Sequence, residues 1–214
     1  TVADGKMTAA MTMGGTGYRY VYIGTAGEAA SASADAYISN GENAEGAHTF
    51  TVPVEALDAG ISCAAFSRKK EMWYDRTLVF RSDSLKAADG SGKDAFRADA
   101  FPTAESLGLS DGSYETAVTL GGGSGKASVE SPCKFTVADG KMTATITWSS
   151  PHYDYMLVNG EKYQPVNTEG NSVFEIPVSC FDRHLAVVAD TTAMSEPHEI
   201  DYTLCFDSSS VTGQ

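Results

Sequence analysis

The stretch TVADGKMTA at residues 1–9 is repeated without change at residues 136–144. An identical run of this length is too long for coincidence, so it marks an internal repeat. The match continues further along both copies, because FTVPV at 50–54 corresponds to FEIPV at 174–178 and TLVF at 77–80 corresponds to TLCF at 203–206. We therefore expect two copies of one module.

The repeated stretch leads into a strand pattern. Within residues 141–148 apolar and polar side chains alternate, which is the period of a half-buried β-strand. The apolar positions are Met142, Ala144, Ile146 and Trp148, and the first copy has Met7, Ala9, Met11 and Met13 at the matching positions. The Asp-Gly pairs at 4–5 and 139–140 are typical of the tight turns that open such hairpins.

Other short alternating runs predict strands at 153–158, 173–178, 185–189 and 200–206, separated by turn residues such as Asn159-Gly160. No segment has a convincing amphipathic helical pattern. Many short strands without helices are typical of an antiparallel β-sandwich. The predicted fold is therefore all-β, with two tandem immunoglobulin-like antiparallel β-sandwich domains.

The repeat also sets the expected domain boundaries. The first domain covers 1–82 and lacks an opening strand, because it has no counterpart of residues 111–135 and carries an extra loop around 29–46. Residues 83–110 are polar and small, which is typical of a linker. The complete second domain covers 111–207, with its first strand at 116–120, and 208–214 form a tail.

The first copy lacks its opening strand, which affects how the chain is expected to associate. Since Thr1 corresponds to Thr136, we expect the chain to be trimmed at its start. A sandwich without its opening strand leaves backbone donors and acceptors unpaired, and such edges invite strand addition. Strand-swapped self-association is therefore expected.

The composition excludes several kinds of partner. A formal charge of −13 leaves too few Lys and Arg to neutralise nucleic-acid phosphates or an anionic membrane surface. No apolar run approaches the ~20 residues of a spanning helix, so no membrane insertion is expected in this segment. There is also no Gly-x-Ser-x-Gly elbow, and GGGSGK at 121–126 lacks the Walker pattern, so the chain is not expected to be an enzyme.

The chain has only four cysteines. None is spaced as Cys-x-x-Cys, so no zinc site is expected from them. Cys63 follows the apolar parity of its neighbours and is expected to be a free core thiol. Cys133 and Cys180 also follow that parity and form the favoured pair for a disulfide bridge, while the state of Cys205 is left open.

The second copy carries three short sequence patterns in order over residues 111–207. These are DGSY at 111–114, TVADGK at 136–141 and HEIDYTL at 198–204. In this order they resemble the NEAT (near iron transporter) domain of Gram-positive surface proteins. The first looks like that family's opening strand, the second like its second-strand signature, and the third lies where the family carries Tyr-x-x-x-Tyr. Residues 124–132 fall where the family has a short helical lip over its pocket.

This resemblance implies a haem site in a slot between the lip and the last hairpin. Tyr202 matches the second tyrosine, which in the family hydrogen-bonds the iron-ligating first tyrosine, and His198 replaces that first tyrosine. Histidine is itself a common axial ligand of haem iron. The first copy has Met72 and Arg76 at these positions, so it is expected to bind haem poorly.

Other residues complete the predicted haem site. Met194 lies in the hairpin loop ahead of His198 and is a candidate iron ligand, although a loop methionine more often only fills space. Ile200 and Tyr202 would contact the porphyrin face, and Ser124 and Ser128 would bind the propionates. In the alternative interpretation His198 ends a strand and Tyr202 is a core tyrosine with a satisfied hydroxyl.

A second group of candidate functional residues is a run of alternating tyrosines, called the tyrosine ladder below. Alternation predicts that Tyr153 and Tyr155 share one face of a strand, and the first copy has Tyr18, Tyr20 and Tyr22 in the matching run. Such rings form ordinary cross-strand pairs, add to a haem pocket or bind glycans.

The predicted function is a haem-binding module of a Gram-positive cell-surface or secreted protein, which captures and transfers haem for iron acquisition. Its expected partners are haem, haem-carrying proteins and neighbouring modules of the same surface protein. The alternative is a non-catalytic immunoglobulin-like structural or adhesion repeat, with or without glycan binding.

Overall fold

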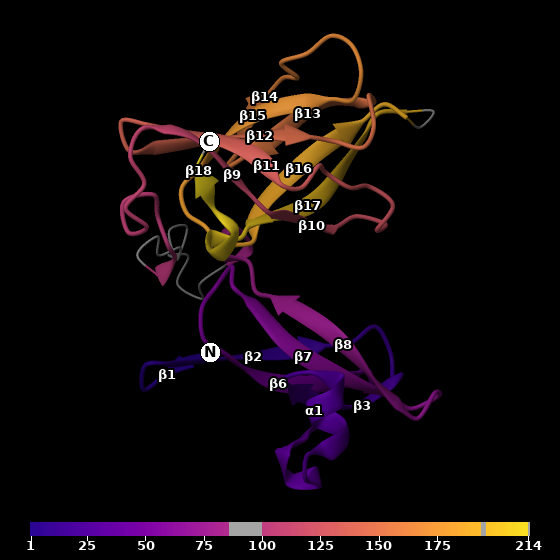
Figure 1. Ribbon diagram of the computed structural model, residues 1–214. Helices are drawn as coiled ribbons and strands as arrows, with labels where there is room; N and C mark the ends of the chain where they lie inside the picture. The colour runs from indigo at the N-terminus through magenta and orange to yellow at the C-terminus, as the bar shows by residue number, and fades with distance from the viewer. Residues whose placement is uncertain (86–99, 194–195, 214) are drawn as a thin grey trace. The chain divides into compact units, whose positions relative to one another are not determined.

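The computed structural model describes residues 1–85, 100–193 and 196–213 (Figure 1). The fold is all-β with four antiparallel sheets, as predicted. The chain divides into two compact units, Thr1–Arg81 and Ser82–Gln214. Each unit contains two of the sheets, which gives it a β-sandwich character.

The first unit is built from eight strands. One sheet has the order β1 (Val2–Ala3), β2 (Lys6–Thr12), β6 (His48–Val54) and β5 (Gly41–Glu42). The other has the order β4 (Ile38–Ser39), β3 (Tyr18–Ile23), β7 (Gly60–Ser67) and β8 (Met72–Val79). The helical elements are α1 (Ala26–Ser31) and the 3₁₀ turn η1 (Ala34–Ala36).

The second unit is larger. One sheet has the order β15 (Val173–Val178), β12 (Lys141–Thr147), β11 (Cys133–Ala138), β9 (Gly112–Thr116) and β18 (Thr212–Gly213). The other has the order β10 (Val118–Gly122), β17 (His198–Phe206), β16 (Leu185–Thr191), β13 (Tyr153–Val158) and β14 (Glu161–Tyr163). The 3₁₀ turns η2 (Ser82–Ser84) and η4 (Ser208–Ser210) lie at its two ends in sequence.

The two copies pair their strands in the same register. Met7 lies opposite Val54 in the first unit, and the matching Met142 lies opposite Val178 in the second. In the last hairpin Cys63 lies opposite Arg76, and Val187 lies opposite Tyr202. The sequence repeat is therefore a repeat of backbone pairing, and positions in one unit can be matched to positions in the other.

The cores of the two units differ in depth. The predicted inner face of β12 and its end is fully buried: Met142 is 5% exposed, and Ala144, Ile146 and Trp148 are each 0% exposed. The matching residues of β2 alternate in the predicted phase but are only half-buried. Alternation thus predicted which side chains point inward in both copies, whereas their depth depends on what covers them.

Covering strands account for this difference. In the second unit β10 lies along the edge of β17, and β11 lies along the edge of β12. Among the described residues of the first unit, no strand lies along the outer edge of β8, and only the two residues of β1 pair with the outer edge of β2. The first unit therefore buries a smaller cluster, made of Val21, Phe50, Val52 and Cys63.

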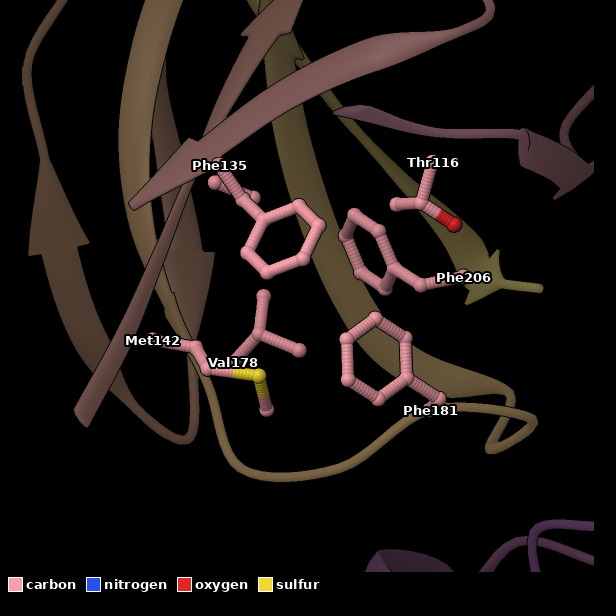
Figure 2. Close-up of a pocket in the computed structure, with 7 residues that line it drawn as sticks. Thr116, Phe135, Met142, Val178, Phe181 and Phe206 are labelled. Carbon is pink, nitrogen blue, oxygen red and sulfur yellow. The ribbon is translucent and has the colours of Figure 1, made fainter. Parts of the chain in front are cut away.

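Three rings form the centre of one part of the second core. Figure 2 shows Phe135, Phe181 and Phe206 pointing toward one another, with Met142 and Val178 beside them. The Phe135 and Phe181 rings meet edge to face at 5.4 Å between centroids. The hollow that these side chains line is too narrow for a water molecule, so it is a gap in the packing and not a ligand site.

The start of the second unit differs from the prediction. The single strand expected at 116–120 is two strands, because β9 ends at Thr116 and β10 begins at Val118 in the opposite sheet. At the crossing the Thr116 hydroxyl donates to the Asp207 carbonyl at 2.7 Å, and the Ala117 N–H donates to Ser210 Oγ at 2.8 Å. The expected tail therefore belongs to the second sandwich.

The end of the expected linker also packs on the second unit. Ala104 is 3% exposed within its core, and the Phe181 N–H donates to the Pro102 carbonyl at 2.8 Å. Residues 86–99 lie outside the described residues. The packing of Ala104 shows that a small, polar composition does not exclude a segment from a core.

Helix α1 was not expected. Thr25 and Glu28 form a capping box at its start, and the Asp75 carboxylate accepts the Ala26 N–H at 2.6 Å. Ala29 is fully buried, and the helix contacts β7 and β8. Within the described ranges, no helix has the length and apolar character needed to cross a membrane.

The four cysteines are all free thiols. The predicted bridge between Cys133 and Cys180 is therefore wrong in this structure, although both side chains are buried as their parity indicated. Cys63 is a buried free thiol, as predicted. Parity places a side chain on a face of its strand, but it does not bring two sulfur atoms within bonding distance.

Candidate functional site

A β-bulge in β13 divides the predicted tyrosine ladder. Tyr153 pairs with Thr191 and Tyr155 with the adjacent Asp190, so one extra residue lies between the two tyrosines. Tyr153 points into the core and is 7% exposed, whereas Tyr155 is only half-buried. The prediction that they share a face is wrong, because the extra residue reverses the alternation.

The inward tyrosine belongs to a buried aromatic cluster. The rings of Trp148 and Tyr153 lie 4.1 Å apart between centroids, and those of Trp148 and Tyr202 lie 5.1 Å apart, edge to face. The hydroxyls of Tyr153 and Tyr202 are 3.3 Å apart, and the Trp148 indole N–H donates to Met156 Sδ at 3.4 Å. Burial, and then the hydrogen bond with Tyr202, raise the pKa of Tyr153 above its usual range.

A crossing segment, residues 123–129, covers this cluster. The Gly123 N–H donates to the Asp201 carbonyl at 3.2 Å in β17, and Val129 pairs with Trp148 at the end of β12. A Cβ on Gly123 would lie 2.5 Å from Tyr202 Cε1, so only glycine fits against this ring. Residues 124–132 contain no helix, so the helical lip implied by the family resemblance is wrong here.

His198 and Ile200 lie further along the same inner face of β17. His198 opens the strand opposite Thr191 and is exposed, while Ile200 is half-buried against the core. Tyr202, two residues further on, is 3% exposed. The face thus changes from open to buried along five residues of strand, and only its His198 end is accessible.

The hairpin end beside His198 is tied to the neighbouring strand. The Thr192 N–H and hydroxyl donate to the His152 carbonyl at 2.8 and 3.2 Å. Met194, the predicted second iron ligand, lies outside the described residues. The described part of this end therefore presents two exposed histidines, His198 and His152, on a hydrogen-bonded frame.

The predicted propionate-binding serines lie near the two ends of the crossing segment. Ser124 is exposed in the turn that follows Gly123. Ser128 is also exposed, and it exchanges two hydrogen bonds with Ser149: its carbonyl accepts the Ser149 N–H at 2.9 Å, and its N–H donates to Ser149 Oγ at 3.1 Å. Both serines are at the surface, one near each end of the segment that covers Tyr202.

The outer face of the same sheet carries a polar cluster that the sequence patterns did not indicate. The Tyr155 hydroxyl donates to Glu199 Oε1 at 2.7 Å, and Lys162 Nζ lies 3.4 Å from the centre of the Tyr155 ring. The hydrogen bond to Glu199 is the main cause that raises the pKa of Tyr155 to about 12. Burial, followed by a hydrogen bond with Asp154, raises the pKa of Asp190.

This outer cluster depends on the bulge, which turns Tyr155 outward beside Glu199 and Asp190. No periodic pattern indicates it, because two tyrosines separated by one residue are expected on the same face of a regular strand.

The first unit has different side chains at the matching positions. Arg76 stands where the second unit has Tyr202, and its Nη2 donates to the Tyr18 hydroxyl at 3.2 Å. Met72 stands where the second unit has His198 and is 49% exposed. A bulge again separates Tyr18 from Tyr20. The backbone is shared, but the imidazole is not.

Metal-ligating groups do not gather elsewhere. Across residues 1–85, 100–193 and 196–213, no three His, Cys, Asp or Glu side chains lie where they could together hold a metal ion. Any iron at His198 would therefore have to arrive with its own ligands, as it does in a porphyrin. A comparison of the chain with protein-family models finds no match, and a comparison with curated proteins finds none either.

Proposed function

We propose that the second unit binds haem through His198, as a non-catalytic module of a Gram-positive cell-surface or secreted protein that captures haem and passes it on. The observation that carries this proposal is the exposed imidazole of His198, which continues an apolar inner face formed by Ile200 and Tyr202. Neutral histidine is a common axial ligand of haem iron. The resemblance to the NEAT family, in which the same strand carries the iron ligand, supports the proposal.

The residues of this end fit a porphyrin in part. His198 can supply one axial nitrogen, and half-buried Ile200 can contact an apolar ring face. Tyr202 does not fit as a ligand, because its hydroxyl is paired with that of Tyr153 and its ring is covered by Gly123. We propose that Tyr202 supports β17 from within the core and that the exposed serines 124 and 128 contact haem. Met194 lies outside the described residues and stays a candidate iron ligand.

The second unit would then act by binding and release, with no bond made or broken in the ligand. A single axial ligand on an exposed strand end leaves the other side of the iron open to a donor or acceptor protein. Haem, haem-carrying proteins and neighbouring modules are therefore the proposed partners. The first unit, with Met72 and Arg76, would bind haem weakly or not at all.

A second candidate function is a structural or adhesive repeat. The Trp148, Tyr153 and Tyr202 cluster favours it, because a closed core with satisfied polar tips needs no ligand to explain it. In this case His198 would only end a strand. The two candidates differ in one observable, which is the binding of haem.

A hemin titration of the full chain, followed by absorbance, separates them. We expect a saturable Soret shift whose shape changes in the His198→Ala variant. His184→Ala is the matched control, because His184 precedes β16 at the end of the sheet opposite to His198. A shift that ignores His198→Ala would move the ligand to Met194 or a tyrosine, and no shift would favour the structural or adhesive function.

A further inference from the structure

A polar groove lies on the second unit beside β13 and β14, two strands away from β17. It has a volume of about 320 Å³, which is near the lower end of the range for small-molecule sites. The residues that line it are Pro151, Tyr153, Asp154, Gln164, Pro165, Asn167, Thr168, Gly170 and Ser172. They come from two loops, residues 149–154 and 164–172, which are joined to different strands.

Ser172 fixes one loop against the other. Its N–H donates to the Ser150 carbonyl at 3.0 Å, and its carbonyl accepts the Trp148 N–H at 2.9 Å. Its buried hydroxyl oxygen accepts the Tyr153 N–H at 3.1 Å. One residue thus uses its three polar groups to hold the floor of the groove to the ends of β12 and β13.

Asn167 fixes the second loop internally. Its Nδ2 donates to the carbonyls of Glu169 and Asn171, each at 2.7 Å, and its Oδ1 accepts the Val173 N–H at 2.9 Å. The Val166 N–H also donates to the Val173 carbonyl at 2.8 Å. Since both walls are held in place before any ligand arrives, binding would cost little ordering entropy.

The lining has a distinct chemistry. Gln164 and Thr168 offer uncharged donors and acceptors, Asp154 offers one carboxylate, and the prolines offer small apolar faces. Among the residues that the structure describes, no Lys, Arg or His lines the groove, and the chain carries a charge of −13, so a phosphate or carboxylate ligand is disfavoured.

We propose that this groove binds a small neutral saccharide. Sugar hydroxyls both donate and accept hydrogen bonds, which matches an amide, a hydroxyl and a carboxylate, and the C–H face of a sugar ring suits the surfaces of Pro151 and Pro165. This site contains Tyr153 of the predicted tyrosine ladder but not Tyr155, which points to the other side of the bulge. It is also separate from the proposed haem contacts, because His198, Ile200, Ser124 and Ser128 do not line it, and Tyr153 is the residue that it shares with the aromatic cluster.

The test is chemical-shift mapping on the ¹⁵N-labelled full chain with a panel of neutral sugars: glucose, galactose, mannose, N-acetylglucosamine and lactose. We expect at least one sugar to shift the amide signals of Thr168, Gly170 and the Gln164 side chain in a saturable way. Gln164→Ala and Thr168→Ala should each weaken that binding about fivefold, the loss expected for one hydrogen bond of ~1 kcal/mol. Glu175→Gln, on an exposed position of β15 outside the groove, should leave it unchanged.

Two results would overturn the proposal. One is the absence of saturable shifts with every sugar of the panel while the wild-type spectrum is that of a folded protein. The other is a set of shifts that lies elsewhere, for example on Tyr20 and Trp73 of the first unit, and ignores the groove variants. Hemin binding is measured on the same variants and is expected to stay unchanged, so failure of one proposal does not decide the other.

Discussion

The two units share their strand register but differ in the side chains at the centre of their inner faces. The second unit places Trp148 and Tyr202 against Tyr153, and Gly123 closes the cluster. The first unit has Met13 and Arg76 at the corresponding positions, around Tyr18. The difference shows that two units can share a strand register while one of them encloses a smaller core, because the backbone pairing is satisfied in both.

The outer faces also differ, but here the first unit carries the aromatic side chains and the second carries polar ones. At the positions of Tyr155, Asp190 and Glu199 the first unit has Tyr20, Phe66 and Trp73. Tyr37, from the insertion that includes α1, stacks on this aromatic face with its ring 5.0 Å from that of Trp73 and 5.5 Å from that of Tyr20. The first unit therefore uses its outer face as a second small core, while the second leaves that face polar.

Truncation of the residue at the centre of the inner face should give the largest difference in stability loss between the two units. Trp148→Ala removes a fully buried ring and is expected to lower the free energy of unfolding by about 3–5 kcal/mol. Met13→Ala, at the matching half-buried position, should cost only about 1 kcal/mol. Urea denaturation followed by far-UV circular dichroism measures both. Equal losses would mean that the two cores are equally deep and would contradict the comparison.

The next largest loss of stability should come from substitution of Gly123, which closes the second core. Gly123 and Gly125 both have positive φ, 57° and 76°, but only a Cβ on Gly123 would contact Tyr202. Gly125→Ala should cost about 1 kcal/mol for its backbone conformation alone. Gly123→Ala should cost about 1–3 kcal/mol more, because the ring must shift. If thermal unfolding finds the two variants equally stable, Gly123 does not close the cluster.

The uncovered edges of the first unit predict association between chains. Among the described residues β8 has no partner along its outer edge, and size-exclusion chromatography with light scattering should detect dimers or larger species. Thr77→Lys, on β8, should reduce this association because a charged edge resists pairing. Thr203→Lys is the control, since the matching strand is covered by β10. A monomer at every concentration would argue against an open edge.

Substitution of Asp190 should change stability least, and the change should depend on pH. Its pKa is raised in the folded state, so the folded chain binds a proton more tightly, and stability falls as pH rises above the unfolded value of about 3.9. Asp190→Asn removes this loss. The variant should gain melting temperature near neutral pH but not near pH 3, whereas Glu175→Gln should gain at neither. A gain that is the same at both values would contradict the assigned cause.

Most of the strand faces could be predicted from the sequence, because side-chain direction follows a period of two. The depth of burial could not, since Met11 and Ile146 have the same parity but different covering strands. The bulges could not be predicted either, because one extra residue between Tyr153 and Tyr155 does not change the alternation seen in the sequence. It reverses the faces only once the partner strand is known.

Two other features could not be predicted from periodicity. Thr25 and Glu28 are spaced as a capping box, which could have indicated α1, but the helix is only six residues long and rich in Ala, Gly and Ser. Gly123 had no signal of its own among neighbouring glycines, because its role depends on the contact with Tyr202. The exposed position of His198 followed from its place at the end of a strand, and haem binding there stays a prediction.

The most direct test of the account is the number of haem molecules that one full chain binds. Titration of the chain with hemin, followed at the Soret band, is expected to break at one equivalent, and the His198→Ala variant should lose this break. Two equivalents would mean that Met72 and Arg76 also permit binding and that the two copies do not differ in function. No break at all would contradict the haem proposal and leave the second unit as a structural or adhesive repeat.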